Sequence, residues 1–462
     1  MTNSEPACGR QAACDLLKIY RYKHMKKFEK GSKQLTKAWA FYDWANSVYP
    51  LVISTAIFPI YYSSMTSSFA NESGDISFLG TFWDPTSLYD YTLSLSFLIV
   101  ACCSPILSAI ADYMGNKLKF LKFFCLLGAL SVMCLFFFTG PETLWVALTF
   151  TILASIGFWG SLVFYNAYLP EVAFPEQQDK VSAQGFIYGY AGSVLLLVFS
   201  LVMVQMPELF GITDPTLAPR ITFLLVGVWW IGFAQFTYRR LPNNVYNQKP
   251  EKDFIWKGLK ELKIVLKELV NYPQLKYFLV SFFCFSVGVQ TIVLMAGIFG
   301  SKELGLPTTN LILTIILVQV VAILGAYLFS KLSNKIGNIR TLKLTLIIWG
   351  GVCFLAFSLD KSQANVDYYF YGLGIVLGFV LGATQSIGRS TYSKLLPDTH
   401  DHATYFSFYD VTEKIAIVLG MFVFGLLISI TDSMQYSVLC LALFFAIAYI
   451  VLNRIKATEY VK

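Results

Sequence analysis

Polar residues that could do chemistry stand inside the apolar segments of this chain, beginning with the first. That segment opens with Trp39-Ala-Phe-Tyr-Asp43-Trp-Ala-Asn46-Ser47-Val-Tyr-Pro50, and Asp43, Asn46, Ser47 and Pro50 are spaced i, i+3, i+4 and i+7. A helix places residues at this spacing on one face. A carboxylate within a membrane span is unfavourable unless it faces a polar interior or an aqueous path. The spacing therefore predicts a helix that lines a cavity, with Asp43 and Asn46 facing it.

A second group of charged residues, Asp410, Glu413 and Lys414, interrupts a late apolar segment at i, i+3 and i+4. The acid Asp410 precedes Lys414 by four residues, which is the favoured order for an ion pair on a helix. One lysine cannot neutralise two carboxylates, so Asp410 and Glu413 are both candidate proton carriers. A structural gate near the inner surface is the alternative interpretation, and the sequence leaves both open.

The composition indicates that these residues belong to a membrane protein. Of 462 residues, 56% are hydrophobic and only 14% are charged, whereas about a quarter are charged in soluble proteins. Runs long enough to span a bilayer, about 20 apolar residues each, predict an all-α polytopic protein with twelve transmembrane helices. We place them at 39–62, 88–112, 119–139, 143–168, 183–206, 220–238, 277–300, 309–330, 342–360, 367–391, 405–430 and 435–453.

The distribution of basic residues predicts the orientation of these helices. All Lys and Arg residues but four fall on one side of the membrane; Arg220, Lys302 and Lys361 fall on the other, and Lys414 lies within a span. By the positive-inside rule, both termini are expected in the cytoplasm. This pattern also explains the net charge of +7 without nucleic acid as a partner. The cysteines lie mostly within apolar runs and lack metal-ligand spacing, so no metal and no cofactor is predicted.

The spans divide into two groups of six. We expect a basic cytoplasmic tail at 1–38, bundles at 39–238 and 277–453, a cytoplasmic linker at 239–276 and a short cytoplasmic tail at 454–462. Met25 resembles a start site, so residues 1–24 are a candidate untranslated segment. Within the linker, one face of an amphipathic helix is apolar, favouring a connector on the inner leaflet or against the bundle over a regulatory docking element; its residues are Ile255, Leu259, Leu262, Leu266 and Leu269.

The two halves resemble each other in their short loops. Asp112, Gly115 and Lys117 follow the second span, and Asn334, Gly337 and Arg340 follow the eighth in a similar context. Likewise Tyr168-Leu-Pro170-Glu171 after the fourth span corresponds to Leu395-Leu-Pro397-Asp398 after the tenth. Repeated halves with a site at their interface are typical of secondary transporters.

The loop with Asp112, Gly115 and Lys117 resembles the motif between the second and third spans of the major facilitator superfamily. In that superfamily the motif latches the cytoplasmic side in the outward-facing state. The second copy has Asn334 in place of the acid, with Gly337 and Arg340 retained, so the resemblance implies a weaker second latch.

A sharper resemblance is to the vacuole-effluxer branch of the superfamily, which joins a fungal autophagy-related vacuolar amino-acid exporter with bacterial proteins. It rests on four stretches that together sample residues 39 to about 420: Tyr42-Asp43-Trp44-Ala45-Asn46-Ser47-Val48-Tyr49, Phe164-Tyr165-Asn166-Ala-Tyr-Leu169-Pro170-Glu171, Gln385-Ser386-Ile-Gly388-Arg389-Ser390 and Phe408-Tyr409-Asp410-Val411-Thr-Glu413-Lys414. The resemblance implies two pseudo-symmetric six-helix bundles, alternating access and movement of a small solute. It favours amino-acid efflux and a bacterial cytoplasmic membrane.

In this fold the first, fourth, seventh and tenth spans line the cavity, which by resemblance identifies the candidate site residues. They are Asp43, Asn46, Tyr165, Asn166, Ser286, Gln290, Gln385 and Arg389. Such a cavity could hold a zwitterion, with its carboxylate on Arg389 and its amine on Asp43. Alternatively Asp43 and Arg389 pair within a gate, and the sequence does not choose between these interpretations.

Three classes of function are compatible with a polytopic membrane protein. A proton-coupled secondary transporter, acting as a monomer in the lipid bilayer, is favoured by the duplication and the polar faces. A membrane enzyme is disfavoured because no HExxH, GxSxG or GxxxxGK[ST] motif is present. A receptor or scaffold with the transporter fold, or a uniporter of another solute, remains the alternative. We expect His400-Asp401-His402 to form a solvated loop, and Gly374, Gly378 and Gly382 to form a close-packing stripe.

Overall fold

The computed structural model describes residues 29–243 and 253–455. The expected start at Met25, most of the basic tail and residues 456–462 lie outside this part of the chain. Almost all described residues are helical. The long helices are α2 (Lys33–Asn46), α3 (Phe58–Ser67), α4 (Pro85–Met114), α5 (Lys117–Cys134), α6 (Leu144–Ala167), α8 (Pro175–Gln205), α9 (Leu217–Tyr238), α10 (Phe254–Leu269), α11 (Pro273–Ile298), α12 (Thr308–Ile336), α13 (Asn338–Phe357), α14 (Val366–Leu395), α15 (His402–Thr431) and α16 (Met434–Leu452).

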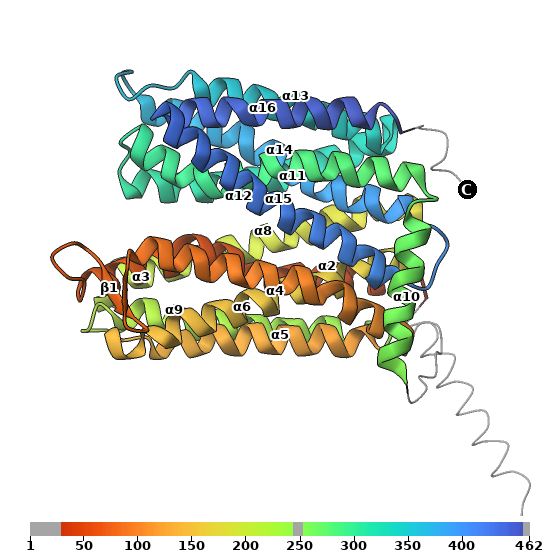
Figure 1. Cartoon of the computed structure of the whole chain (residues 1–462), viewed down its shortest axis with the longest axis horizontal. Coiled ribbons are helices and arrows are strands. Elements are labelled where there is room, and N and C mark those ends of the chain that lie inside the picture. The colour runs from red at the N-terminus through yellow and green to blue at the C-terminus, as the bar shows by residue number, and fades with distance from the viewer. Residues whose placement is uncertain (1–28, 244–252, 456–462) are drawn as a thin grey trace, which may run out of the picture.

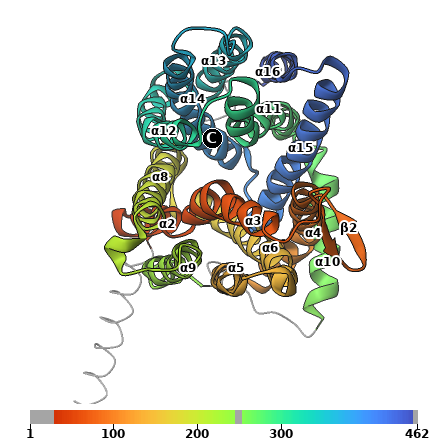
Figure 2. The same ribbon diagram turned by 90° about the vertical axis from the view of Figure 1, so that its left-hand side faces the viewer.

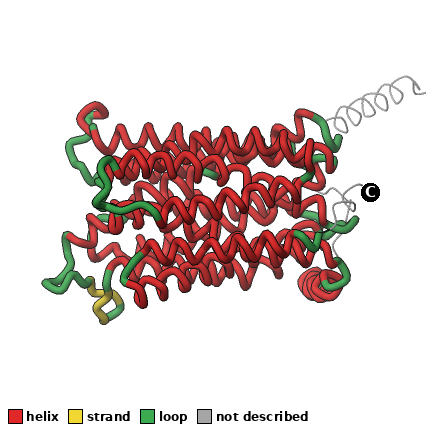
Figure 3. The backbone as a smooth tube through the Cα atoms, turned by 90° about the horizontal axis from the view of Figure 1, so that it is seen from above, coloured by secondary structure: helices red, strands yellow, loops and turns green. Residues whose placement is uncertain are grey.

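Twelve helical segments in the described chain are long and apolar enough to cross a membrane, which confirms the predicted fold class. They lie side by side along one direction, as the tube in Figure 3 shows. The first span begins earlier than predicted, at Lys33, because Ser32 caps its N-terminus and accepts a hydrogen bond from the Leu35 N–H at 3.4 Å. Side-chain caps of this kind satisfy the free N–H groups of the first turn.

The helices form two bundles, one from α2 to α9 and one from α11 to α16 (Figure 1). The described chain starts and ends at the same end of the molecule, where α10 also lies; we call this the termini end. The opposite end carries the short antiparallel hairpin β1 (Ile76–Phe78) and β2 (Thr81–Trp83); we call it the hairpin end.

The two bundles meet along helices at their flanks. Viewed from the hairpin end, α8 of the first bundle lies beside α12, and α15 of the second lies beside α4 (Figure 2). Helix α8 also packs on α14, and α15 also packs on α6. These six helices are therefore the contact surface across which the halves could move relative to each other.

The first span of each half changes helix type toward the hairpin end. Residues Tyr49–Ile57 form a π-helical segment between α2 and α3, and Phe299–Glu303 form one after α11. Pro50 lies in the first of these and has no N–H to donate, and the Thr55 hydroxyl donates to the Pro50 carbonyl at 2.8 Å. Such bulges occur often at functional sites. Both segments lie on the wall of the cavity described below.

The linker helix α10 packs across the termini end against α4. Gly258 approaches the Ile110 backbone closely, and Val265 is buried. Of the predicted apolar face, Leu259, Leu262 and Leu269 are partly buried, whereas Leu266 is exposed. The helix is thus held to the bundle along one stripe only.

Helices α12 and α14 are packed so closely that their glycines touch the opposite backbone. A Cβ atom on Gly382 would lie 2.0 Å from the Ala322 carbonyl oxygen, and one on Gly378 would lie 2.4 Å from the Val318 carbonyl oxygen. This close approach confirms the packing predicted for the glycine stripe of α14 and resembles small-xxx-small contacts of other membrane helices.

We predict that Gly382→Leu destabilises the protein by more than the ~1–3 kcal/mol that is typical of an overpacked side chain. The reason is that the added side chain would clash with backbone atoms of α12, which cannot rotate away. The melting temperature of the detergent-purified protein should fall. Gly372→Leu, on the same helix with open space around its Cβ position, should leave it nearly unchanged. Equal melting temperatures for both variants would contradict the packing described here.

Candidate functional site: a cavity between the two halves

A cavity of about 400 Å³ lies between the bundles. Its wall is mostly apolar and aromatic, and it reaches toward the hairpin end at Phe299 and Leu311. A small set of polar side chains interrupts this wall: Asp43, Asn46, Ser47, Ser54, Thr55, Ser155, Asn166, Tyr190, Ser193, Ser286, Gln290, Thr314, Gln319, Thr384, Gln385, Arg389, Tyr409 and Glu413. Concave, mainly apolar sites with a few polar groups are typical of small-molecule binding.

An ion pair between the halves closes the floor of the cavity. Arg389 of α14 reaches across to Asp43 of α2, with both terminal nitrogens 3.2 Å from the same oxygen, Oδ2. The Tyr165 hydroxyl donates to that oxygen at 2.8 Å. Arg389 and Asp43 are 3% and 4% exposed. Their pairing within the low-dielectric interior is far stronger than it would be in water.

Every N–H group of the Arg389 guanidinium has a protein acceptor. Besides the two bonds to Asp43, Nε donates to Ser182 Oγ at 3.0 Å, Nη2 donates to the Ser182 carbonyl at 2.9 Å, and Nη1 donates to Asn166 Oδ1 at 3.3 Å. A guanidinium has five N–H donors, so a solute carboxylate could bind Arg389 only by displacing one of these acceptors. Of the two interpretations left open by the sequence, the geometry of this state favours the gate.

Aromatic rings complete the surroundings of Arg389. The rings of Phe186, Trp39 and Tyr165 lie 4.1, 4.9 and 5.4 Å from its guanidinium carbon. Trp39 in turn stacks on Tyr165 and donates its indole N–H to the Tyr165 carbonyl at 2.8 Å. These residues all come from the first half, so one arginine of the second half is enclosed by the first.

Gly185 of α8 makes room for this ion pair. A Cβ atom there would lie 2.4 Å from Asp43 Oδ2 and 2.8 Å from Arg389 Nη2. No side chain larger than hydrogen fits without moving the pair. Beside it, the Ser182 hydroxyl donates to the Ser386 carbonyl at 2.8 Å and the Tyr190 hydroxyl donates to Gln385 Oε1 at 2.6 Å.

Helix α15 contributes a second group of charged residues at the cavity. Lys414 Nζ is 2.5 Å from Asp410 Oδ1 and 3.5 Å from Glu413 Oε2, and Gln290 of α11 donates to Glu413 Oε1 at 2.7 Å. The Lys414 ammonium also lies 3.5 Å from the centre of the Trp159 ring of α6. Glu413 and Gln290 face the cavity, whereas Asp410 and Lys414 lie behind it.

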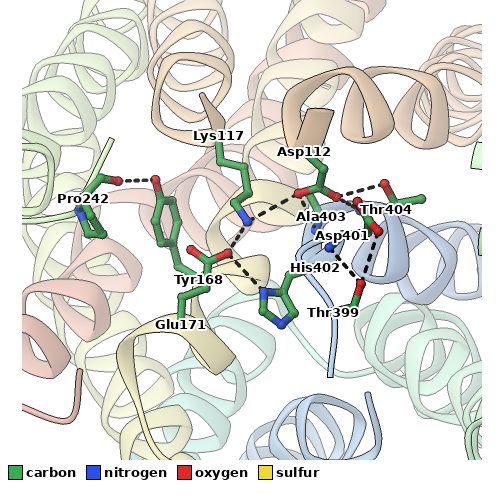
Figure 4. A network of polar contacts seen from close by, with 10 residues as sticks. All are labelled: Asp112, Lys117, Tyr168, Glu171, Pro242, Thr399, Asp401, His402, Ala403 and Thr404. Carbon is green, nitrogen blue, oxygen red and sulfur yellow. Dashed lines mark hydrogen bonds and ion pairs between the residues drawn. The ribbon is translucent and has the colours of Figure 1, made fainter. Parts of the chain in front are cut away.

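A latch at the termini end joins the loop after α4 to the start of α15 (Figure 4). Asp112 accepts hydrogen bonds from the Ala403 N–H at 3.2 Å and from the Thr404 N–H at 2.7 Å, and the Thr404 hydroxyl adds a third at 2.9 Å. The carboxylate thus caps the positive N-terminal end of a helix in the other half. Gly115 ends α4 with φ +64°, which lets the chain turn back to Lys117.

Lys117 extends the latch to two further residues. It pairs with Asp112 at 3.4 Å and makes a closer ion pair with Glu171, and His402 Nδ1 lies 3.1 Å from Glu171 Oε1. His402 is 8% exposed and begins α15. The interpretation of this histidine as a solvated loop residue is therefore wrong, because a sequence pattern with no local partner does not reveal a partner in the other half.

The second latch uses an acid that the sequence comparison of the loops did not identify. Asn334 and Arg340 are exposed, and Gly337, with φ +86°, joins α12 to α13. Asp179 of α8 takes the place of the missing carboxylate. It accepts hydrogen bonds at 2.8 Å from Ser333 Oγ and from Asn338 Nδ2, and pairs with Lys394 at 2.8 Å.

Asp179, Ser182 and Gly185 are thus site residues that the sequence analysis missed. They share one face of α8 with Gly189 and Ser193, spaced as a helix requires. A stripe of small and polar residues in an otherwise apolar span was the available signal. The predicted residues Asp43, Asn46, Asn166, Gln290, Gln385, Arg389 and Glu413 line the cavity. Tyr165 donates to Asp43 from beside it, Lys414 lies 3.5 Å from Glu413, and Asp410 pairs with Lys414.

The contacts between the halves are distributed unevenly. In the described chain, the hydrogen bonds and ion pairs that join them lie at the termini end and on the cavity floor, and Tyr190 and Gln385, which are joined by one of these bonds, both line the cavity. The cavity wall continues from there toward the hairpin end. The structure is therefore a state that is closed at the termini end.

Comparison with known proteins gives concordant results. A family model described as "Vacuole effluxer Atg22 like" matches residues 31–459. YxiO, an MFS-type transporter of Bacillus subtilis (strain 168), is 30% identical over 429 residues, which cover 93% of this chain and 95% of that protein. Autophagy-related protein 22 of Kluyveromyces lactis is 26% identical over 406 residues, covering 79% of each chain.

Solved structures of major facilitator transporters share the fold. The proton:xylose symporter XylE superposes with a TM-score of 0.70 at 13% identity, covering 92% of this chain and 96% of that one. FucP in its outward conformation superposes with a TM-score of 0.67 at 13% identity, covering 92% and 98%.

We predict that Asp43→Asn destabilises the purified protein by about 3–5 kcal/mol, because it leaves a buried guanidinium without its counter-charge. The double variant Asp43→Asn/Arg389→Gln should recover part of this loss, since it removes both charges. Denaturation in detergent, followed by tryptophan fluorescence, measures both. Glu208→Gln, at an exposed acid, is the control. A double variant no more stable than Asp43→Asn would contradict the pairing.

Proposed function

This chain belongs to the Atg22-like vacuole effluxer family and has the major facilitator fold, and from that premise we propose that it is a secondary transporter that moves a small solute by alternating access. The observation that carries the proposal is the cavity between two halves that are joined by polar contacts at one end only. A transporter must hold its solute in such a cavity and expose it to each side in turn.

The distribution of charges supports an orientation of the protein in the membrane. The basic residues gather at the termini end, which under the positive-inside rule is the cytoplasmic end. The state described here is then closed to the cytoplasm and has its cavity directed outward. For the membrane we propose the bacterial cytoplasmic membrane, in view of the similarity to a Bacillus subtilis transporter.

Alternation requires that the floor of the cavity and both latches open together. The Arg389–Asp43 pair and the Asp112 and Asp179 contacts all cross between the halves. Each is lost if the halves separate at the termini end. Contacts at the hairpin end and hydration of the freed charges must compensate for this loss. The free energies of the two states can then differ by only about a few kcal/mol, as is typical of proteins that switch between two conformations.

We further propose that the solute is an amino acid with an apolar side chain, that efflux is its direction, and that protons drive it. The mostly apolar wall of the cavity supports an apolar side chain, and the vacuole-effluxer family supports efflux. Asp410 and Glu413 share a single lysine, which supports a proton as the coupling ion.

Reconstitution into proteoliposomes tests this function. With labelled L-leucine, an imposed pH gradient should drive accumulation against the leucine gradient, and a protonophore should abolish it. A leucine flux that the protonophore does not reduce would instead indicate a uniporter. Binding of leucine without any flux would indicate a receptor that keeps the transporter fold.

We predict that Gly185→Ala shifts the protein toward a form open at the termini end, because the added methyl group displaces Asp43 from Arg389. Spin labels at K119C and K335C, two exposed positions at that end on opposite halves, report the separation. The distance distribution should move to longer values. Gly232→Ala, with open space around its Cβ position, is the control, and an unshifted distribution in Gly185→Ala would refute the gate.

A further inference from the structure

Glu413 gives the cavity a negative charge that the cavity wall does not neutralise. Among the described residues, the charged side chains on that wall are Asp43, Arg389 and Glu413. Asp43 and Arg389 lie 3.2 Å apart and offset each other. Glu413 has no such partner on the wall, and its side chain remains 18% exposed to the cavity side.

The lysine behind Glu413 is mainly engaged elsewhere. Lys414 Nζ lies 2.5 Å from Asp410 Oδ1 but 3.5 Å from Glu413 Oε2. It is 1% exposed and is held over the Trp159 ring, so it cannot turn into the cavity without leaving that ring. With both acids ionised, the cluster of Asp410, Glu413 and Lys414 therefore carries one net negative charge.

Within the described chain, the other elements around Glu413 supply no further cation. Helix α11 presents the neutral amide of Gln290, which donates to Glu413 Oε1 at 2.7 Å, and α6 presents Trp159. On α15 itself the titratable neighbours are Tyr409, Asp410 and Lys414. The remaining charges of the cavity are those of the Asp43–Arg389 pair on its floor.

The chemistry of the wall selects the kind of cation. A carboxylate in a low-dielectric site binds a positive charge tightly, and aromatic rings provide both apolar area and attraction for cations. The rings on this wall include those of Phe97, Phe158, Trp159, Phe186, Phe282 and Phe285. A molecule with one ammonium group and an apolar body matches both features.

We propose that Glu413 binds the ammonium group of an apolar amine or amino acid, and that a proton competes for the same carboxylate. The inference deepens the proposed transport and rests on it for the coupling step. Where the carboxyl group holds a proton, binding of the ammonium ion forms a carboxylate–ammonium pair and releases that proton. Because one carboxylate cannot hold both cations, the protein would exchange one proton for each solute molecule.

A binding experiment with three probes tests this site without requiring transport. The probes are L-leucine, 3-methylbutylamine, which lacks the carboxylate, and 4-methylpentanoate, which lacks the amine. Ligand binding raises the melting temperature of the purified protein by mass action. Leucine and 3-methylbutylamine should stabilise the protein, and 4-methylpentanoate should not. Stabilisation by 4-methylpentanoate alone, or by none of the three, would overturn the proposal.

The pH dependence of amine binding is a second, independent measurement. An alkylammonium stays charged below about pH 9. Any weakening of 3-methylbutylamine binding at lower pH therefore reflects protonation of the protein and not of the ligand. Competition by one proton should raise its Kd by up to about tenfold for each pH unit lowered. Glu413→Gln should abolish both the binding and this slope, and the control Glu208→Gln should retain both. Unchanged amine binding in Glu413→Gln would also overturn the proposal.

Failure of this inference is distinguishable from failure of the transport function. Proton-driven leucine flux that keeps its pH dependence in Glu413→Gln would leave the transporter intact and remove Glu413 as the exchange site. Amine binding at Glu413 in a protein that moves no solute would support the site and contradict the transporter.

Discussion

The closed end of this molecule depends on one buried charge, the guanidinium of Arg389. A cation at 3% exposure within a membrane protein is tolerated only when its charge and all its donors are matched. Here the matching groups belong to the opposite half: Asp43 supplies the charge, Ser182 and Asn166 supply acceptors, and three rings surround the planar group. Separating the halves at this level therefore exposes Arg389 and requires water to replace these contacts.

The two latches reinforce the same closure by different chemical routes. In the first, Asp112 binds the N-terminus of α15 and Lys117 connects it to Glu171. In the second, the acid is Asp179, which lies on a helix of the first half and receives Ser333, Asn338 and Lys394 of the second. The two latches thus occupy corresponding positions in the fold but use different residue types. A loop-by-loop comparison of the two halves therefore identifies only one of the two latches.

Some features of this molecule can be predicted from its sequence and others cannot, for physical reasons. Twelve spans were predictable because an apolar run of sufficient length has few alternatives to a membrane helix. Asp43 and Asn46 were predictable as cavity residues because polar groups on a helix face are rare in a span. The α8 residues beside Arg389 were not predictable as site residues, because Ser182 and Gly185 are small and common residues. His402 was misinterpreted because its partner Glu171 comes from a remote segment.

The contact of Asp112 with the main-chain N–H groups of Ala403 and Thr404 has a consequence for how this latch tolerates mutation. Those two donors belong to the backbone, so a change of side chain at Ala403 or Thr404 leaves them in place unless it introduces proline. The two main-chain donors of the second half therefore survive the loss of a side chain, whereas the acceptor side rests on a single carboxylate. Removal of Asp112 eliminates all three of its hydrogen bonds to α15 at once.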